Sequence, residues 1–241
     1  MKGPGRRFGS ERHGSRAREL TAHGRDVLYG VHAVREALRN RDRTFDRVLL
    51  AEARGQHAVS EILELAASRG VAVERVDRAR LTEITGTSHH QGVAGIAAKL
   101  RCLDLTELLE RLRQVETPAL IVTDGVEDPA NLGAILRSAE VMGFNGLVVP
   151  ERRAVGVTPA VVRASAGAAE YLPIARVVNV VRAVKCLKEE GFWVVGLEAA
   201  SPVRCFDTNL LGRIAIVVGS EGRGIRRLVG EECDVLVAVP V

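Results

Sequence analysis

Five apolar runs in the second half of the chain constrain the fold more than any other feature of the sequence. They read ALIVTD, GLVVP, FWVVGLE, RIAIVVG and VLVAVP, and they begin at Ala119, Gly146, Phe192, Arg213 and Val235. Because Val, Ile and Leu follow one another with little polar alternation, these runs are typical of strands that are buried on both faces. They predict a mainly parallel sheet covered by helices, which is an α/β domain. We expect the covering helices at about 131–142, 158–168, 179–190 and 223–230.

A second, smaller α/β unit is expected before this domain. From residue 26 to about residue 100, short strands alternate with amphipathic helices such as VHAVREALRN and HAVSEILELAASRG. Residues 101–118 are expected to form a connecting helix that ends at Pro118. The sequence therefore predicts a small unit at 26–100, a linker helix at 101–118 and a larger domain at 119–241.

Residues 1–25 differ from the rest of the chain in composition. They are rich in Gly, Ser and Arg, and the whole formal excess of +4 arises within the first 26 residues. Such a segment cannot bury apolar area, so we expect a disordered basic tail. It can serve as a tether to the phosphate backbone of a nucleic acid or simply as a solubilising leader.

Overall composition excludes several classes of protein. With 46% hydrophobic residues among 241, the chain has ample material for a core and is not globally disordered. No apolar run approaches the roughly 20 residues of a membrane span, and no secretory signal is present. The four cysteines are far apart and form no C-x-x-C, which suits a reducing compartment. We expect a cytoplasmic protein that does not enter membranes.

The first unusual loop follows the run ALIVTD. In DPANLGAILRSAE, residues 128–140, Asn131 is a plausible N-cap of the next helix. The buried stripe of this helix is expected to hold Leu132, Ile135, Leu136 and Ala139. Arg137 lies off that stripe, and Gly133 lets another group approach the backbone closely. The alternative is an ordinary capped helix with a solvated arginine.

The second unusual loop is VVGSEGRGIRRL, residues 217–228, which follows another apolar run. Gly219, Gly222 and Gly224 make a flexible bend around Glu221, but the spacing matches neither a dinucleotide-binding nor an NTP-binding motif. Such a bend can present backbone amides to a ligand, or it can be only a tight turn. Both loops lie where strands of a parallel sheet end, which is where ligands bind in such folds.

These two loops together resemble the SpoU (TrmH-like) branch of the SPOUT RNA methyltransferases. NLGAILR at 131–137 and VVGSEGRG at 217–224 resemble its first two motifs, and RASAGAAEYLPIARV at 163–177 is similar to the segment between them. YGVHAVREAL at 29–38 and HHQGVAGIAA at 89–98 resemble the small ribosomal-protein-like substrate-binding domain of many members. The resemblance covers about residues 26–240. Its nearest subgroup methylates a guanosine ribose 2′-hydroxyl in 23S ribosomal RNA.

The resemblance implies an α/β-knot fold, S-adenosylmethionine as cofactor, RNA but not DNA as partner, no metal, and usually a homodimer. It places the catalytic positions at Arg137, Asn131 and Glu221, and the cofactor-binding positions at Leu197, Glu198, Gly219, Val239 and Val241. Arginine is a very weak base, so for Arg137 a positioning or phosphate-binding role is easier than base action. Glu221 is expected to orient Arg137 by a charge-assisted hydrogen bond.

RNA contacts of the small unit are expected to be electrostatic. Only 3% of the residues are aromatic, which argues against a stacking platform for bases. The expected contacts are Arg35, Arg39, Arg41, Arg43 and His90, with a solvated helix end and structural packing as the alternatives. The adjacent His89 and His90 are a poor metal site, because neighbouring strand residues face opposite ways.

The third motif of the family continues past the last strand with Ser-Leu-Asn and a helix, whereas this sequence ends at VAVPV. We therefore expect a C-terminally truncated catalytic domain that binds S-adenosylmethionine weakly and dimerises poorly. Two other interpretations stay open. One is a non-catalytic RNA-binding protein that keeps the fold, and the other is a tRNA 2′-O-methyltransferase.

Overall fold

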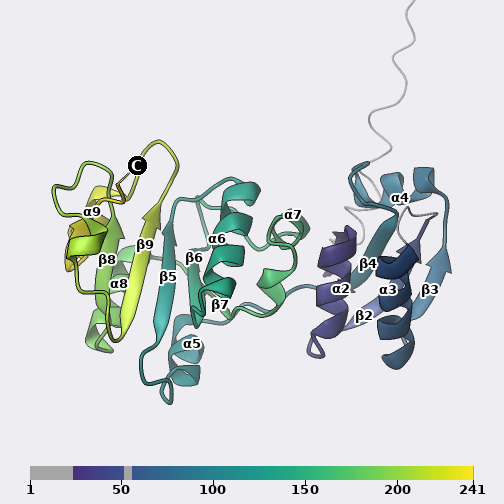
Figure 1. Cartoon of the computed structure of the whole chain (residues 1–241), viewed down its shortest axis with the longest axis horizontal. Coiled ribbons are helices and arrows are strands. Elements are labelled where there is room, and N and C mark those ends of the chain that lie inside the picture. The colour runs from purple at the N-terminus through teal and green to yellow at the C-terminus, as the bar shows by residue number, and fades with distance from the viewer. Residues whose placement is uncertain (1–23, 52–55, 241) are drawn as a thin grey trace, which may run out of the picture. The chain divides into compact units, whose positions relative to one another are not determined.

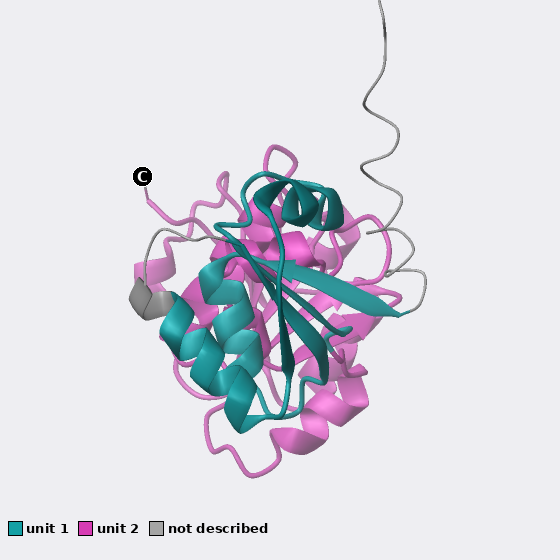
Figure 2. Ribbon diagram, turned by 90° about the vertical axis from the view of Figure 1, so that its right-hand side faces the viewer, with its two compact units in different colours: residues 1–100 teal, residues 101–241 magenta. Residues whose placement is uncertain are grey.

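The computed structural model describes residues 24–51 and 56–240, without the side chains of 56–58. The chain divides into two compact units, residues 1–100 and 101–241 (Figure 2). Nearly all of the segment expected to be a basic tail therefore lies outside the described residues. Within the described part of the chain, no helix is long and apolar enough to span a bilayer.

The first unit is a four-stranded sheet with helices on both faces. Its strands are β1 (Arg25–Tyr29), β2 (Phe45–Leu50), β3 (Ala72–Arg75) and β4 (Val93–Ala98), in the order β1-β4-β2-β3. Its helices are α2 (Val31–Arg39), α3 (Gln56–Ser68) and α4 (Arg78–Thr85). The two faces follow from the alternation of side chains along β4. Ala94 and Ile96 pack with Leu81 and Ile84 of α4, whereas Gly95 faces α2.

Arg43, expected at an RNA surface, lies inside this unit, so that expectation does not hold for it. Its side chain is 2% exposed, and Nη2 donates a hydrogen bond of 2.8 Å to a carboxylate oxygen of Asp26. Burial raises the pKa of Asp26, and the positive charge of Arg43 opposes that shift. Arg69 donates to the carbonyls of Leu38 and Asn40 and so folds the segment after α2 inward. A buried charge needs a partner of opposite charge, which Asp26 provides. Arg43 therefore stabilises the fold and is not available to RNA.

His90 is also buried rather than placed on an RNA surface. It is 1% exposed, and its Nδ1 accepts a hydrogen bond of 3.0 Å from the backbone N–H of Gly92. Its Nε2 lies 3.1 Å from the hydroxyl of Thr82, which itself donates to the carbonyl of Arg78. Because Nδ1 accepts, the ring is neutral with its proton on Nε2. The interpretation of His90 as a packing residue is the one that this geometry favours.

This neutral ring predicts a pH dependence of stability. Burial, and secondarily the charge of Arg78, lowers the pKa of His90 below its usual value of 6.5. The unfolded chain then takes up a proton at higher pH than the folded chain, so the free energy of unfolding falls as pH drops from about 7. NMR titration should show the pKa of His90 below its usual value of 6.5. His90→Gln should flatten the decline of stability between about pH 7 and 5, and an unchanged decline would contradict the assignment.

The second unit is built on a six-stranded sheet in which every pair is parallel, as the apolar runs predicted. Its strands are β5 (Ala119–Asp124), β6 (Gly146–Pro150), β7 (Ile174–Val177), β8 (Trp193–Leu197), β9 (Ile214–Gly219) and β10 (Val235–Val237). The order is β10-β8-β9-β5-β6-β7 (Figure 1). From β5 the chain proceeds outward through β6 and β7 and then returns to the other side of the sheet. The neighbouring β5 and β9 therefore flank a switch point, where open α/β sheets bind ligands.

Helices cover both faces of this sheet. They are α5 (Leu105–Arg111), α6 (Pro129–Val141), α7 (Pro159–Ala164), α8 (Val180–Glu189) and α9 (Arg227–Gly230). Apolar residues of α5, α8 and α9 share one core cluster with inward-facing positions of five of the strands. α6 packs against α7, and Figure 1 shows α6 in front of the sheet and α8 behind it.

Three helices are shorter than the sequence predicted. The linker is helical only over α5, which begins after the N-cap Asp104, while Leu103 pairs with Ala175 at the edge of the sheet. α7 stops at Ala164 because Ala166 and Gly167, two and three residues later, take left-handed backbone conformations. α9 begins only at Arg227, because the backbone of Arg226 is extended and its N–H donates to Asp124 at the end of β5.

Candidate active site

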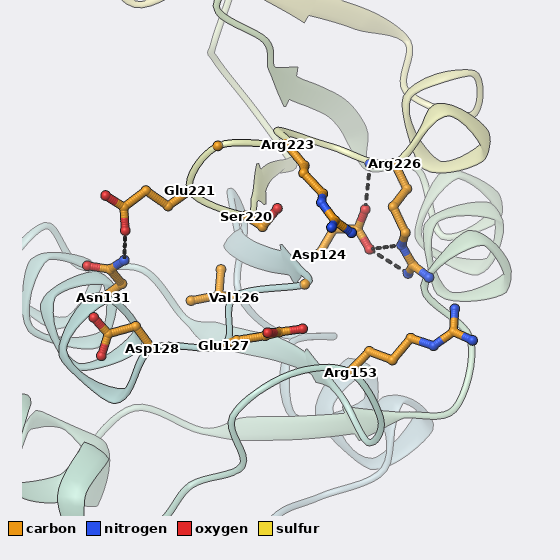
Figure 3. A pocket seen from close by; sticks show the side chains of 12 residues that line it. Asp124, Val126, Glu127, Asp128, Asn131, Arg153, Ser220, Glu221, Arg223 and Arg226 are labelled. Atoms are coloured by element: carbon orange, nitrogen blue, oxygen red, sulfur yellow. Dashed lines mark hydrogen bonds and ion pairs between the residues drawn. The ribbon is translucent and has the colours of Figure 1, made fainter.

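Two pockets adjoin at the carboxyl ends of β5, β8 and β9. The larger has a volume of about 610 Å³ and lies between the loop after β5, residues 125–128, and the glycine turn after β9, residues 219–224 (Figure 3). The smaller has a volume of about 460 Å³ and lies between the glycine turn and the end of β8. Ser220, Gly222 and Arg223 line both pockets. Both volumes fall in the range of sites for small molecules.

In the larger pocket Asn131 pairs with Glu221, and the expected capping role of Asn131 is wrong. The N-cap of α6 is Asp128, whose carboxylate accepts from the backbone N–H of Ala130 at 2.8 Å. Pro129 occupies the first turn, where its lack of an N–H costs nothing. The side chain of Asn131 is therefore free to reach across the pocket, and its Nδ2 donates to Glu221 at 3.0 Å.

The Asn131–Glu221 bond fixes the orientation of the Asn131 amide. An ionised carboxylate only accepts hydrogen bonds, so the amide NH₂ group must face Glu221. The amide oxygen of Asn131 then has no hydrogen-bond partner among the described residues. The site thus offers the neutral amide oxygen of Asn131 next to the carboxylate of Glu221, and the hydrogen bond between the two side chains keeps both in place.

Arg137 does not join this pair, so the expected hydrogen bond from Arg137 to Glu221 is absent from the described structure. Arg137 lies six positions after Asn131 in the helix, which turns the two side chains toward different sides of α6. Arg137 is exposed, as its position off the buried stripe predicted, and forms no hydrogen bond or ion pair with a described residue. Gly133, one turn earlier, is where α7 comes close: a Cβ there would lie 2.4 Å from that of Ala164.

The glycine turn is a closed and tightly packed structure. The backbone N–H groups of Ser220 and Gly224 each donate to the other's carbonyl, at 3.0 and 2.9 Å. A Cβ added to Gly219 would lie 2.0 Å from the carbonyl carbon of Gly224. Real Cβ atoms do not approach backbone so closely, so only glycine fits at position 219.

Asp124 and Arg226 anchor this turn to β5, and neither residue was singled out from the sequence. Asp124 is 1% exposed, and its carboxylate accepts from the backbone N–H and the Nε of Arg226, both at 2.8 Å, and from Nη2. The hydrogen bond to Asp124 raises the pKa of Arg226 and so keeps its charge in place. The sequence signal for this contact was weak: Asp124 is an aspartate at the end of an apolar strand. Its partner Arg226 is 102 residues away in the chain.

The smaller pocket gathers four of the five residues expected to bind the cofactor. Leu197, Glu198, Gly219 and Val239 all line it, together with apolar neighbours such as Val218. Val241 lies outside the described residues. The end of β8 and the residues after it thus supply one wall, and Val239, which follows β10, supplies another.

The remaining arginines expected to contact RNA lie on or after α2. Arg35 and Arg39 are partly exposed, and each forms ion pairs with Glu36 and Glu61 of their own unit. Arg41 is exposed and makes no ion pair with any residue in the described ranges. Of the four arginines expected, Arg41 is therefore the one whose charge is most available to a phosphate.

This architecture defines the class. Solved structures with the same fold include an AdoMet-bound rRNA methyltransferase from Sinorhizobium meliloti, with 23% identity, a TM-score of 0.75, and coverage of 93% of this chain and 84% of that one. Another is the SpoU methyltransferase AviRb from Streptomyces viridochromogenes with AdoMet, with 22% identity, a TM-score of 0.76, and coverage of 96% and 89%. The fold is thus the α/β fold of SPOUT-type methyltransferases, and at these identities the likeness concerns the fold alone.

The family follows from sequence comparison. Residues 118–241 match the SpoU rRNA Methylase family, and residues 27–102 match the domain described as RNA 2′-O ribose methyltransferase substrate binding. The chain belongs to the SpoU methylase family, which confirms the resemblance inferred from its motifs.

Several relatives are similar over most of this chain. The 23S rRNA (guanosine-2′-O-)-methyltransferase RlmB of Coxiella burnetii is 40% identical over 89% of this chain and 86% of its own length. The putative TrmH family tRNA/rRNA methyltransferase YacO of Bacillus subtilis is 39% identical over 90% and 86%. An uncharacterised tRNA/rRNA methyltransferase of Synechocystis is 39% identical over 90% of this chain, which spans 56% of that relative's length.

Proposed function

We propose that this protein transfers a methyl group from S-adenosylmethionine to the ribose 2′-oxygen of a nucleotide in RNA. The observation that carries the proposal is the junction of the two pockets at the switch point. One pocket is suited to a cofactor and the other to a hydroxyl, and they share the glycine turn, including Ser220 and Gly222. A methyl donor and its acceptor need this kind of adjacency.

The smaller pocket fits the chemistry of S-adenosylmethionine. Leu197, Val218 and Val239 offer apolar walls to an adenosyl group, and the glycine turn offers backbone polar groups. Glu198 places a carboxylate beside the turn, which suits a positively charged sulfonium. When bound, the cofactor supplies an electrophilic methyl group to an oxygen in the adjoining pocket.

The larger pocket fits a ribose hydroxyl. The amide oxygen of Asn131 can accept a hydrogen bond from the 2′-hydroxyl and thereby orient a lone pair of the ribose oxygen toward the shared wall, while the proton stays on that oxygen until the methyl group is transferred and then leaves to solvent. Glu221 holds the amide in this orientation and adds negative potential near the proton that must leave. We assign to Arg137 the binding of an RNA phosphate, because its free guanidinium group can neutralise the phosphate charge and orient the RNA.

The test is transfer of tritium from labelled S-adenosylmethionine to a transcript of 23S ribosomal RNA, followed by nucleoside mapping. We expect the label in a 2′-O-methylnucleoside. Glu221→Ala should lower kcat by about 100-fold, since loss of one oriented polar group in a site has effects of that order. Glu140→Ala, on the exposed side of α6, is the matched control and should keep normal turnover. Methylation of a base would contradict the proposal, and RNA binding without transfer would favour the non-catalytic alternative.

The finer substrate assignment is a guanosine of 23S ribosomal RNA. It is supported by the 40% identity to the Coxiella relative that is named for this reaction. The Bacillus relative is named for tRNA or rRNA, so tRNA is the alternative substrate. Parallel assays with 23S and tRNA transcripts decide between them, because only the true substrate should saturate the enzyme at low concentration.

We further propose that the protein is cytoplasmic and takes part in ribosomal RNA processing. Its first unit binds RNA through Arg41, assisted by Arg35 and Arg39. Its second unit is knotted and forms a homodimer. Phe206 and Leu211, between β8 and β9, are 80% and 84% exposed, which supports burial against a second copy. The backbone of Ala238 bonds to Val203 and Cys205 in the same segment, which supports a knot at this end of the sheet. Sedimentation velocity of the chain measures the oligomeric state.

A further inference from the structure

We infer that the arginine side of the larger pocket, formed by Arg153, Arg223 and Arg226, binds a phosphodiester of the RNA next to the methylated ribose. The inference rests on the proposed function for the identity of the ligand. It adds a phosphate subsite that neither the motifs nor the comparisons assign to these residues.

The pocket has two chemically distinct sides. Asn131, Glu221 and Asp128 lie on one side in Figure 3, and Arg153 and Arg226 lie on the other, with Arg223 reaching in from the glycine turn. A ligand that touches both sides must offer hydroxyl-like polarity at one end and negative charge at the other. A nucleotide in RNA has this form, because its 2′-hydroxyl and its 3′-phosphate are on neighbouring carbons.

The two sides of the pocket differ in charge. Asp124 is occupied by Arg226, Asp128 caps α6, and Glu221 accepts from Asn131. Arg153 and Arg223 are exposed, and neither forms a hydrogen bond or ion pair within the described ranges. Glu127 is exposed and unpaired among the same residues. Asp128 and Glu221 keep their negative charges, because a backbone N–H and a neutral amide do not cancel them. On the arginine side Asp124 balances only Arg226, so the free guanidinium groups of Arg153 and Arg223 make this side locally positive and suited to a phosphodiester.

Both free arginines stand on constrained backbone. Arg153 has a φ of 56°, a left-handed conformation that a residue with a side chain rarely adopts. Its loop is tied to the wall of the pocket, because the backbone N–H of Val155 donates to the carbonyl of Val126 at 3.0 Å. Arg223 belongs to the glycine turn that Ser220 and Gly224 close. Backbone that is already ordered reduces the entropy that must be lost when a ligand binds.

Guanidinium groups suit phosphate better than other cations do. Their planar fork donates two parallel hydrogen bonds to phosphate oxygens and keeps its charge at any relevant pH. Arg226 adds a third guanidinium group to the site. Its Nε and Nη2 are bound to Asp124, so its position is fixed while its side chain stays 53% exposed. The subsite therefore consists of two guanidinium groups without partners in the described ranges, those of Arg153 and Arg223, and one that is anchored by Asp124.

The experiment compares Arg153→Gln and Arg223→Gln with Arg152→Gln in the full chain. Arg152 is an exposed arginine in the same loop that does not line the pocket. Binding of a 23S ribosomal RNA transcript is measured by filter retention over a range of salt. Arg153→Gln should lower the slope of log K against log salt by about 1 and weaken binding at low salt by about tenfold, as loss of one phosphate contact does. Arg152→Gln should leave both unchanged.

Two additional measurements separate a phosphate contact from general surface charge. Arg153→Lys should restore the salt slope but not the full affinity, because lysine keeps the charge without the fork. Affinity for S-adenosylmethionine should be unchanged in Arg153→Gln, since Arg153 lines only the larger pocket. Equal slopes for Arg153→Gln and Arg152→Gln overturn the inference. The slopes are read from RNA binding alone, so they decide it even if the wild-type chain transfers no methyl group and the proposed function fails.

Discussion

Gly219→Ala is expected to abolish S-adenosylmethionine binding. The new Cβ would lie 2.0 Å from the carbonyl carbon of Gly224 and 2.3 Å from the nitrogen of Ile225, and these backbone atoms cannot move aside alone. The glycine turn must open, and with it the wall that the two pockets share. We expect an affinity loss of at least about 100-fold by calorimetry, with a stability loss of about 1–3 kcal/mol typical of overpacking.

Gly143→Ala is the matched control for this effect. Gly143 follows α6, has a φ of 76°, and has open space around the added Cβ. Alanine there is strained by its backbone conformation and should cost about 1 kcal/mol of stability, without reaching either pocket. If Gly219→Ala binds the cofactor as tightly as Gly143→Ala does, the shared wall is not part of the cofactor site.

The sequence predicted the parallel sheet well because burial on both faces leaves a direct mark on composition. It missed β7, Ile174–Val177, because IARV is short and contains a charged residue. The strand order was beyond reach, since it depends on pairings such as β5 with β9, whose residues are far apart in the chain. Local periodicity carries no information about such pairings.

Errors at the helix ends and in the small unit have local causes. Asn131 is a good N-cap residue, but Asp128 followed by Pro129 is an equally good signal three residues earlier, and it prevails. Arg43 and His90 were interpreted as surface residues because charged and polar side chains usually are. Their burial depends on Asp26 and Thr82, partners that the chain brings to them only after folding.

The residues of the candidate site were likewise predicted only in part from the sequence. The motifs placed Leu197, Glu198, Gly219 and Val239 together, and these residues do line one pocket. The motifs could not reveal that Asp124 holds Arg226, because neither residue is unusual by itself. Pairs of this kind determine the shape of the site, and they appear only when two loops meet at the switch point.

Arg137→Ala is expected to reduce methyl transfer by at least about 100-fold, the scale seen when one oriented group is lost from a site. Arg137 is exposed on α6 without partners in the described chain, so stability should change by less than about 0.5 kcal/mol. Arg176→Ala, an exposed arginine on β7, is the control and should leave turnover intact.

The kinetic form of the Arg137→Ala defect distinguishes the two roles that remain for this residue. Arg137 is turned away from Asn131 and Glu221, so it must meet the RNA from outside the larger pocket. If it only binds a phosphate, KM should rise while kcat persists, and Arg137→Lys should recover part of the loss. If its contact with the RNA also aligns the nucleotide so that the 2′-oxygen faces the methyl group, kcat should fall, and lysine should fail because it lacks the planar fork. Near-normal kcat and KM in Arg137→Ala would remove Arg137 from the catalytic machinery.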